Sequence, residues 1–131
     1  MLWQVKPLNY RDMIKQPPNS SVCGQCCLGT ILGISLDQAI ALVGHSRGTR
    51  LKRDLYPHFN AASDRLTKGF PEKYSLCKVH FTGFNGTHWV LYNHFKVYDP
   101  NIGWWVPFEY WEEAFLPVVP RITSYVEIKG G

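Results

Sequence analysis

The chain has 131 residues, enough for one domain of ordinary size and too few for two. Hydrophobic residues make up 45% of it and charged residues 18%, which excludes a disordered chain and predicts a packed core. The net charge of +4 is mild and gives no reason to expect a nucleic-acid partner.

No apolar run approaches the roughly 20 residues that a membrane-spanning helix needs, so no membrane partner is expected. The opening residues MLWQVKPLNYRD also lack the apolar stretch of a secretory signal. We therefore expect a cytoplasmic protein whose four cysteines are reduced thiols. Residues 1–131 are expected to form a single domain that begins with an extended arm over residues 1–15. The oligomeric state is left open.

Helical patterns fill the first half of the chain. After the loop PPNSS, apolar residues recur at helical spacing from Cys23 to Leu32, and Gly33 is the expected end of that helix. Ser35 and Gln38 have the spacing of a capping box that opens a second helix. A third helix is expected from Thr49 to about Phe59, and residues 60–72 are expected to form a loop.

Strand patterns follow. Short runs of β-branched and aromatic residues predict strands over residues 74–81, 88–92, 95–99, 103–108 and 121–128, and residues 109–115 predict a short helix. Helices come first and an antiparallel sheet follows, which is the order of an α+β fold.

Cys23 is the candidate nucleophile. The N-terminus of a helix has unpaired N–H groups and about half a positive charge, which together stabilise a thiolate in the first turn. Gly24 beside it is expected to let a substrate approach the backbone closely. Cys26 and Cys27, one turn further along, are expected to belong to the core.

A histidine and a carboxylate meet in the predicted hairpin. If Asn93 and His94 form a two-residue turn, counting back along both strands sets His88 directly opposite Asp99. A nucleophilic cysteine needs a base and a group that orients the base, and these two residues are the candidates. The alternative is an ordinary cross-strand pair on the surface.

Three stretches together, QPPNSSVCGQCCL, THWVLY and VYDPNIGWW, resemble the motifs of papain-like cysteine peptidases. The resemblance is nearest to the peptidases that process bacteriocin leaders and to their free-standing relatives in bacteria and phages. It implies a papain-like fold, in which an N-terminal helical half packs its catalytic helix on a C-terminal antiparallel sheet. It also implies the roles of Cys23 as nucleophile, His88 as general base and acid, Asp99 as orienting residue, and Gln16 as oxyanion donor.

The implied reaction is hydrolysis of a peptide or isopeptide amide bond in a peptide or protein substrate, without a cofactor or a metal. Cleavage after small residues such as Gly-Gly comes from the same resemblance, and the loop TGFNGT before His88 is expected to shape the groove. Amidases, acyltransferases and enzymes that remove ubiquitin-like tags use the same triad, and the sequence does not separate these classes.

Structural zinc is the main competing hypothesis. Cys23 and Cys26 form one pair of possible ligands, and Cys77 and His80 form another. However, Cys77 and His80 lie three residues apart in a predicted strand, so their side chains point to opposite faces.

A redox dithiol and a phosphate-binding patch are also compatible with parts of the sequence. CGQC at a helix start has the form of a redox dithiol, although prolines precede it instead of a central strand. The segment SRGTRLKR offers either a basic patch for phosphates or a solvated helix face. A papain-like domain that binds a protein without catalysis is a further alternative, although Cys23, His88 and Asp99 are all present and this alternative requires an unseen loss of activity.

Other aromatic and histidine residues carry weaker expectations. Trp89 is expected in the core, and Trp104 or Trp105 either in the core or on the cleft wall. His45 and His58 are expected to be exposed.

Overall fold

The computed structural model describes residue 5 and residues 13–130, so most of the expected N-terminal arm lies outside the described residues. The helical elements are α1 (Cys23–Leu32), α2 (Leu36–Val43), the π-helical turn η1 (Leu51–Leu55), the 3-10 turn η2 (Tyr56–His58), α3 (Phe108–Trp111) and the 3-10 turn η3 (Glu112–Phe115). The strands are β1 (Thr67–Lys68), β2 (Ser75–Phe81), β3 (Thr87–Asn93), β4 (Lys96–Tyr98), β5 (Trp105–Pro107) and β6 (Pro120–Glu127).

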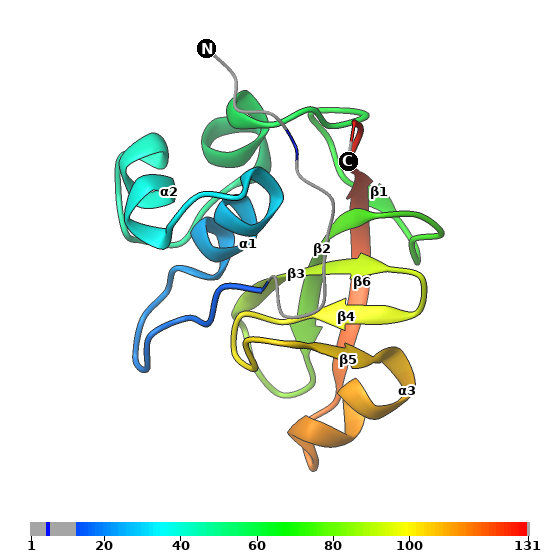
Figure 1. The fold of residues 1–131 in the computed structure, drawn as a ribbon. Helices are drawn as coiled ribbons and strands as arrows, with labels where there is room; N and C mark the ends of the chain where they lie inside the picture. The colour runs from blue at the N-terminus through cyan, green and yellow to red at the C-terminus, as the bar shows by residue number, and fades with distance from the viewer. Residues whose placement is uncertain (1–4, 6–12, 131) are drawn as a thin grey trace.

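One antiparallel sheet organises the second half of the chain. Its six strands lie in the order β1-β6-β2-β3-β4-β5, and each neighbouring pair is antiparallel. Figure 1 shows α1 and α2 together on one side of the molecule, with the sheet beside them and α3 near the far end of the sheet. The fold is therefore α+β, as predicted from the order of the patterns.

Both faces of the sheet are covered, because alternate residues of its strands enter two hydrophobic clusters. On one face, Leu76 and Leu91 pack with residues of α1. On the other face, Val90 packs with the fully buried Trp111 of α3. The sheet thus separates the helical half of the protein from the short helix α3.

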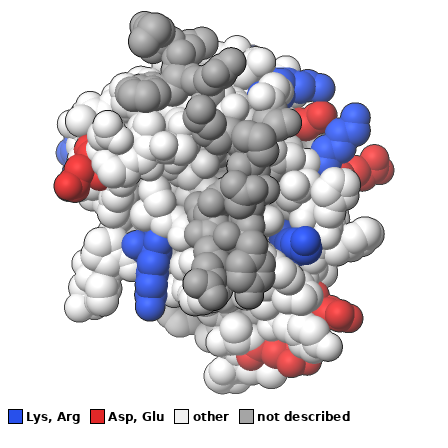
Figure 2. Space-filling view, viewed as in Figure 1, with Lys and Arg blue, Asp and Glu red and all other residues white. Residues whose placement is uncertain are grey.

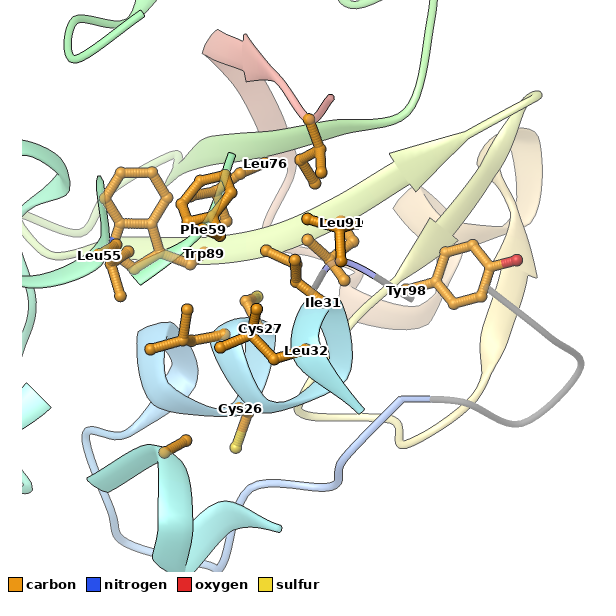
Figure 3. Packing of buried hydrophobic residues seen from close by; sticks show 14 of the residues in the cluster. Cys26, Cys27, Ile31, Leu32, Leu55, Phe59, Leu76, Trp89, Leu91 and Tyr98 are labelled. Atoms are coloured by element: carbon orange, nitrogen blue, oxygen red, sulfur yellow. The ribbon is translucent and has the colours of Figure 1, made fainter. Parts of the chain in front are cut away.

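The helix α1 lies between the sheet and α2. In Figure 3, Cys27 and Ile31 point from α1 toward Leu91 on the sheet, and Cys26 points to the opposite side of the helix. Cys26 and Cys27 are completely buried, which confirms that they belong to the core. A helix covered on two sides explains why every residue of α1 except Cys23 is buried.

The predicted end of the first helix and the predicted start of the second helix are both confirmed. Gly33 closes α1 in the left-handed conformation, with φ of 68°, which glycine adopts without a steric cost. Ser35 opens α2 with the expected capping box: its hydroxyl accepts from the Gln38 N–H, and the Gln38 side chain accepts from the Ser35 N–H.

The predicted third helix is wrong in its start and in its type. A single π-helical turn begins at Leu51 and passes into a 3-10 turn that ends at His58, and the Thr49 hydroxyl makes no hydrogen bond within the described residues. Pro57 lacks the N–H that a continuing α-helix would use. The buried carboxylate of Asp54 organises the segment instead, by accepting the Arg50 N–H at 2.7 Å.

The predicted register of the hairpin is also wrong. The turn residues are His94 and Phe95, both with positive φ, and Asn93 pairs with Lys96. Relative to the prediction, one strand has moved by two residues along the other. Because side chains alternate with a period of two, this shift leaves every side chain on its expected face, and the hydrophobic pattern does not distinguish the two registers.

Within the described residues, no single helix is both long and apolar enough to cross a membrane, although the bent pair α1 and α2 passes this test by length and composition when taken together.

The capping box offers a test of how the first two helices are joined. Replacing Ser35 by Ala removes the acceptor for the Gln38 N–H and should lower the free energy of unfolding by about 1 kcal/mol. Urea denaturation measures this change, and Ser46→Ala in the exposed turn after α2 is the matched control, with an effect below about 0.5 kcal/mol. Equal effects of the two substitutions would contradict the assigned cap.

Candidate active site

Cys23 is the first residue of α1 and is half-buried at the edge of the helix. The Val22 carbonyl accepts the Cys26 N–H at 2.9 Å, and this hydrogen bond closes the first turn of α1, which contains Cys23. The N-cap position holds Val22, which offers no side-chain acceptor, and the first turn contains no acidic residue. The positive end of the helix therefore acts on Cys23 without a competing side chain.

Gly24 allows a close contact inside the protein, and its expected role toward a substrate stays a prediction. A Cβ atom built on Gly24 would overlap the Oγ1 atom of Thr49, so the segment after α2 occupies the space beside this glycine. The close contact brings residues 47–50 against the start of α1. Gln25 reinforces the contact, because its fully buried amide donates to the carbonyls of His45 and Arg47 at 3.0 and 2.9 Å.

His88 lies near the start of β3, and its side chain is buried. Its Nε2 atom lies 2.6 Å from Oδ1 of Asp99, and the ring also forms a hydrogen bond with Cys23. Because an imidazole has two ring nitrogens, Nδ1 is the atom left to face the thiol. The structure therefore brings the three predicted residues into one hydrogen-bonded series.

The surroundings of His88 decide its charge. Burial alone lowers the pKa of His88, but the hydrogen bonds to Asp99 and Cys23 and the charges of these two residues outweigh it and raise the pKa to about 9. His88 is therefore an imidazolium at neutral pH, with its ring held between a carboxylate and a sulfur.

Asp99 is completely buried just after the end of β4. Oδ1 accepts from the Asn101 N–H at 2.9 Å as well as facing His88, and Oδ2 accepts from the Trp111 indole N–H at 2.9 Å. The predicted direct opposition of His88 and Asp99 does not occur, since the observed register continues to Val90 opposite Asp99. His88 is instead the diagonal neighbour on the same face, which is still within reach.

Gln16 reaches the site along the segment that precedes α1. Its backbone N–H donates to the Pro100 carbonyl at 2.7 Å, so the segment runs beside the turn that follows Asp99. Its side-chain Oε1 accepts the Val22 N–H at 2.9 Å, and its Nε2 donates to Oδ1 of Asn101 at 2.8 Å. Gln16 is thus held at both ends of its amide, between the start of α1 and the His88–Asp99 pair.

Sequence reasoning missed Asn101 and Trp111. Asn101 lies two residues after Asp99 in DPN, and its Nδ2 atom is 3.5 Å from Nε2 of His88. The adjacent Asp and Pro offered a local signal for Asn101, since such residues form turns that bond back to the preceding carboxylate. No local pattern indicated that the Trp111 indole would satisfy Asp99.

A cavity of about 730 Å³ opens beside these residues and is lined by Cys23, His88, Gln16 and Trp89 among others. Trp89 is buried as predicted, and its indole N–H donates to the Thr49 carbonyl at 3.3 Å. Neither Trp104 nor Trp105 lines this cavity, and Thr87 is the member of the TGFNGT loop that does. Residues 47–50 of the segment after α2 form part of the wall instead.

The structure does not bring the four proposed zinc ligands together. Cys26 belongs to the cluster on the α1 face of the sheet, Cys77 to the cluster on the other face, and His80 is exposed. In the part of the chain that the structure describes, no group of three or more His, Cys, Asp or Glu side chains is placed to hold a metal ion.

The other three thiols differ sharply from Cys23. All four cysteines are free, but burial raises the pKa of Cys26 to about 12 and raises the pKa of Cys27 and Cys77 well above the usual range. Cys23 alone is partly exposed and beside an imidazole. The four thiols are therefore not equivalent in reactivity.

His45 and His58 are both half-buried, which corrects the expectation that they are exposed. His45 lies beside a carboxylate. Its Nε2 lies 3.2 Å from Oδ1 of Asp54, and Asp54 also accepts two hydrogen bonds from the Arg53 guanidinium. The Arg53 hydrogen bond is the main reason that the pKa of Asp54 lies well below its usual range. This second histidine–aspartate pair fixes the segment that walls the cavity.

Comparison with protein-family models, with curated proteins and with solved structures gave no match for this chain.

The thiols are expected to differ in their reaction with iodoacetamide. In a brief pulse at pH 7, Cys23 should be labelled at least about tenfold faster than the three buried thiols, because it is accessible and beside an imidazolium. Mass spectrometry of the digested protein measures this preference. His88→Ala should slow the labelling of Cys23 and so reduce the preference, and His80→Ala on the neighbouring strand should not, whereas equal labelling of all four thiols in the unmodified protein would contradict the assignment.

The charge of His88 can be followed by NMR. The ring should stay protonated through neutral pH and lose its proton near pH 9, and Asp99→Asn should lower that midpoint because the carboxylate is lost. The stability that this charge contributes is complete below about pH 6.5 and is lost as the pH rises to about 9. A midpoint near 6.5 in the unmodified protein would show that Asp99 does not support the charge.

Proposed function

We propose that this chain is a cysteine peptidase of the papain-like type, with Cys23 as nucleophile and His88 as general acid and base. The observation that carries the proposal is the series Cys23–His88–Asp99 at the edge of a cavity, with 2.6 Å between His88 and Asp99. The motifs around these residues, which resemble those of the papain-like peptidases, support it independently.

The first chemical step uses the charge separation between Cys23 and His88. The imidazolium favours the thiolate of a sulfur placed beside it, and the thiolate attacks the carbonyl carbon of the scissile amide to form a C–S bond. His88 then gives its proton to the leaving nitrogen as the C–N bond breaks. The amine departs and a thioester on Cys23 remains.

The second step reverses the role of His88. The neutral ring takes a proton from a water molecule, which attacks the thioester carbonyl and releases the carboxylic acid and the thiol. Asp99 keeps Nε2 of His88 occupied throughout, so that Nδ1 faces the reacting atoms. The net reaction consumes one water molecule for each amide bond and needs no other reactant.

Gln16 is the proposed oxyanion donor, together with the backbone N–H of Cys23. The Gln16 amide nitrogen has two N–H groups and gives one of them to Asn101. The second is available to a negative oxygen that develops near Cys23, and Gln16 lines the same cavity as Cys23. Asn101 is a positioning residue: it holds the Gln16 amide in place, and the Gln16 amide would contact the substrate.

The substrate class follows from the resemblance, which suggests an extended peptide cleaved after small residues such as Gly-Gly. Peptide, isopeptide and other amide substrates share the chemistry described above. A setting in which thiols stay reduced, such as the cytoplasm, suits a protein with four free cysteines.

A peptide library tests the reaction. Incubation of the protein with amide-capped peptides in water enriched in ¹⁸O should produce new carboxyl termini that carry the heavy isotope, and mass spectrometry identifies the cleavage site. Cys23→Ala and His88→Ala should each lower the rate by at least about 1,000-fold, since each removes a member of the reacting pair. His80→Ala is the matched control and should leave the rate within about twofold.

Two results would count against the proposal. Cleavage that continues in Cys23→Ala would assign the activity to another group or to a contaminant. Binding of a target protein at equal strength by the unmodified chain and by Cys23→Ala, with no new termini in any peptide, would favour a binding domain without catalysis.

A further inference from the structure

We propose that the cavity beside Cys23 recognises acidic side chains, so that the substrate is a peptide with Asp or Glu close to the scissile bond. This inference rests on the proposed peptidase function and names the substrate class of the same site. It is carried by basic side chains that enter one cavity from separate elements of the fold.

Besides His88, the cavity that contains Cys23 is lined by four Lys and Arg residues and, among the described residues, by no acidic one. Arg47 and Arg50 come from the segment after α2, Arg53 from η1, and Lys78 from the middle of β2. Lys78 is paired directly with Trp89 of β3, so the two side chains lie on the same face of the sheet and line the same cavity. Cationic groups therefore approach from the loop side and from the sheet side.

These cations are not equivalent, because Arg53 already has a partner. Its guanidinium makes two hydrogen bonds to the buried Asp54, at 3.0 and 2.9 Å, and this carboxylate neutralises it. Arg47, Arg50 and Lys78 have no carboxylate within ion-pair distance in the part of the chain that the structure describes. Three cations of the cavity are thus free to pair with an anionic ligand.

The segment that carries Arg47 and Arg50 is held in place by buried contacts. The amide of Gln25 in α1 binds the Arg47 carbonyl, Asp54 binds the Arg50 N–H, and Thr49 packs onto Gly24 next to the nucleophile. The main-chain positions of Arg47 and Arg50 are therefore fixed relative to Cys23 before a ligand binds. Preorganised positions of this kind lower the cost of ordering that binding would otherwise incur.

The number of free cations fits a peptide better than a nucleic acid. Of the basic residues in SRGTRLKR, Lys52 lies 3.6 Å from Asp64 and Arg53 is bound to Asp54. Duplex nucleic acid presents about one negative charge per 1.7 Å and calls for an extended basic surface. On the face seen in Figure 2, the Lys and Arg side chains of the described residues are separated by neutral and acidic residues. One or two carboxylates of a peptide match the three free cations.

Matched peptides test this inference. Starting from a peptide that the protein cleaves, each position near the scissile bond is changed in turn to Glu, Gln and Lys. The best Glu peptide should exceed its Gln counterpart about tenfold in kcat/KM, because two exposed cations and one half-buried cation contribute about twofold each. The same peptide with Lys should be the poorest of the three, and the preference for Glu should shrink as salt is raised from about 50 to about 500 mM.

Substitutions in the cavity locate the effect. Arg47→Gln, Arg50→Gln and Lys78→Gln should each reduce the Glu-to-Gln ratio by about half, and the triple substitution should bring it close to 1. Lys52→Gln is the matched control, since it removes one charge from the same segment but lies outside the cavity and pairs with Asp64. Circular dichroism confirms that each variant is folded, and the salt series on the unmodified protein gives an answer that does not depend on any variant.

The outcomes separate this inference from the function on which it rests. Cleavage of neutral peptides with no preference for Glu would overturn the acidic subsite and leave the peptidase intact. If no peptide is cleaved, fluorescence anisotropy of labelled Glu and Gln peptides on Cys23→Ala decides: Glu-selective binding that Arg47→Gln weakens supports the subsite, and equal binding overturns it. Tighter binding of a 12-nucleotide single-stranded RNA than of the Glu peptide would also overturn it, in favour of a nucleic-acid site.

Discussion

The candidate site depends on one buried carboxylate. Asp99 is completely buried, and an ionised group in that position is stable only if its oxygens are paired. His88, the Asn101 N–H and the Trp111 indole supply those partners from three parts of the chain. Satisfying this one group therefore fixes the start of β3, the turn after β4 and the helix α3 relative to one another.

A second set of contacts transmits that geometry to the nucleophile. Asn101 holds the side chain of Gln16, and Gln16 in turn accepts the N–H of Val22 at the start of α1. The N-terminus of α1 is thus tied to the Asp99 turn through hydrogen bonds as well as through the packing of α1 on the sheet. A thiol and an imidazole that lie 65 residues apart in the chain are held together by this arrangement.

The hairpin shows how a correct pair can come from an incorrect register. Counting from a turn at Asn93 and His94 identified His88 and Asp99 as partners, whereas the turn is formed by His94 and Phe95. The error was two residues, so it changed the partners across the strands but left each side chain on its own face. His88 and Asp99 still meet because diagonal neighbours on one face lie within reach of a long side chain. The Phe95 carbonyl at the turn accepts the Phe108 N–H at 2.7 Å. Counting residues along the two strands of the hairpin cannot predict this contact, because Phe108 lies outside both strands.

The sequence by itself determined the features that depend on neighbours along the chain: the helix from Cys23 to Leu32 with Gly33 at its end, the capping box at Ser35, the order of helices before strands, and the common sheet face of His88 and Asp99. Each rests on periodicity or on spacings of a few residues, which local sterics and hydrogen bonding decide. The tertiary structure alone decided the Gln16–Asn101 bond across 85 residues, the indole of Trp111 on Asp99, and the basic wall of the cavity. These contacts join segments whose approach is set by the packing of the whole domain, and no local pattern carries that information.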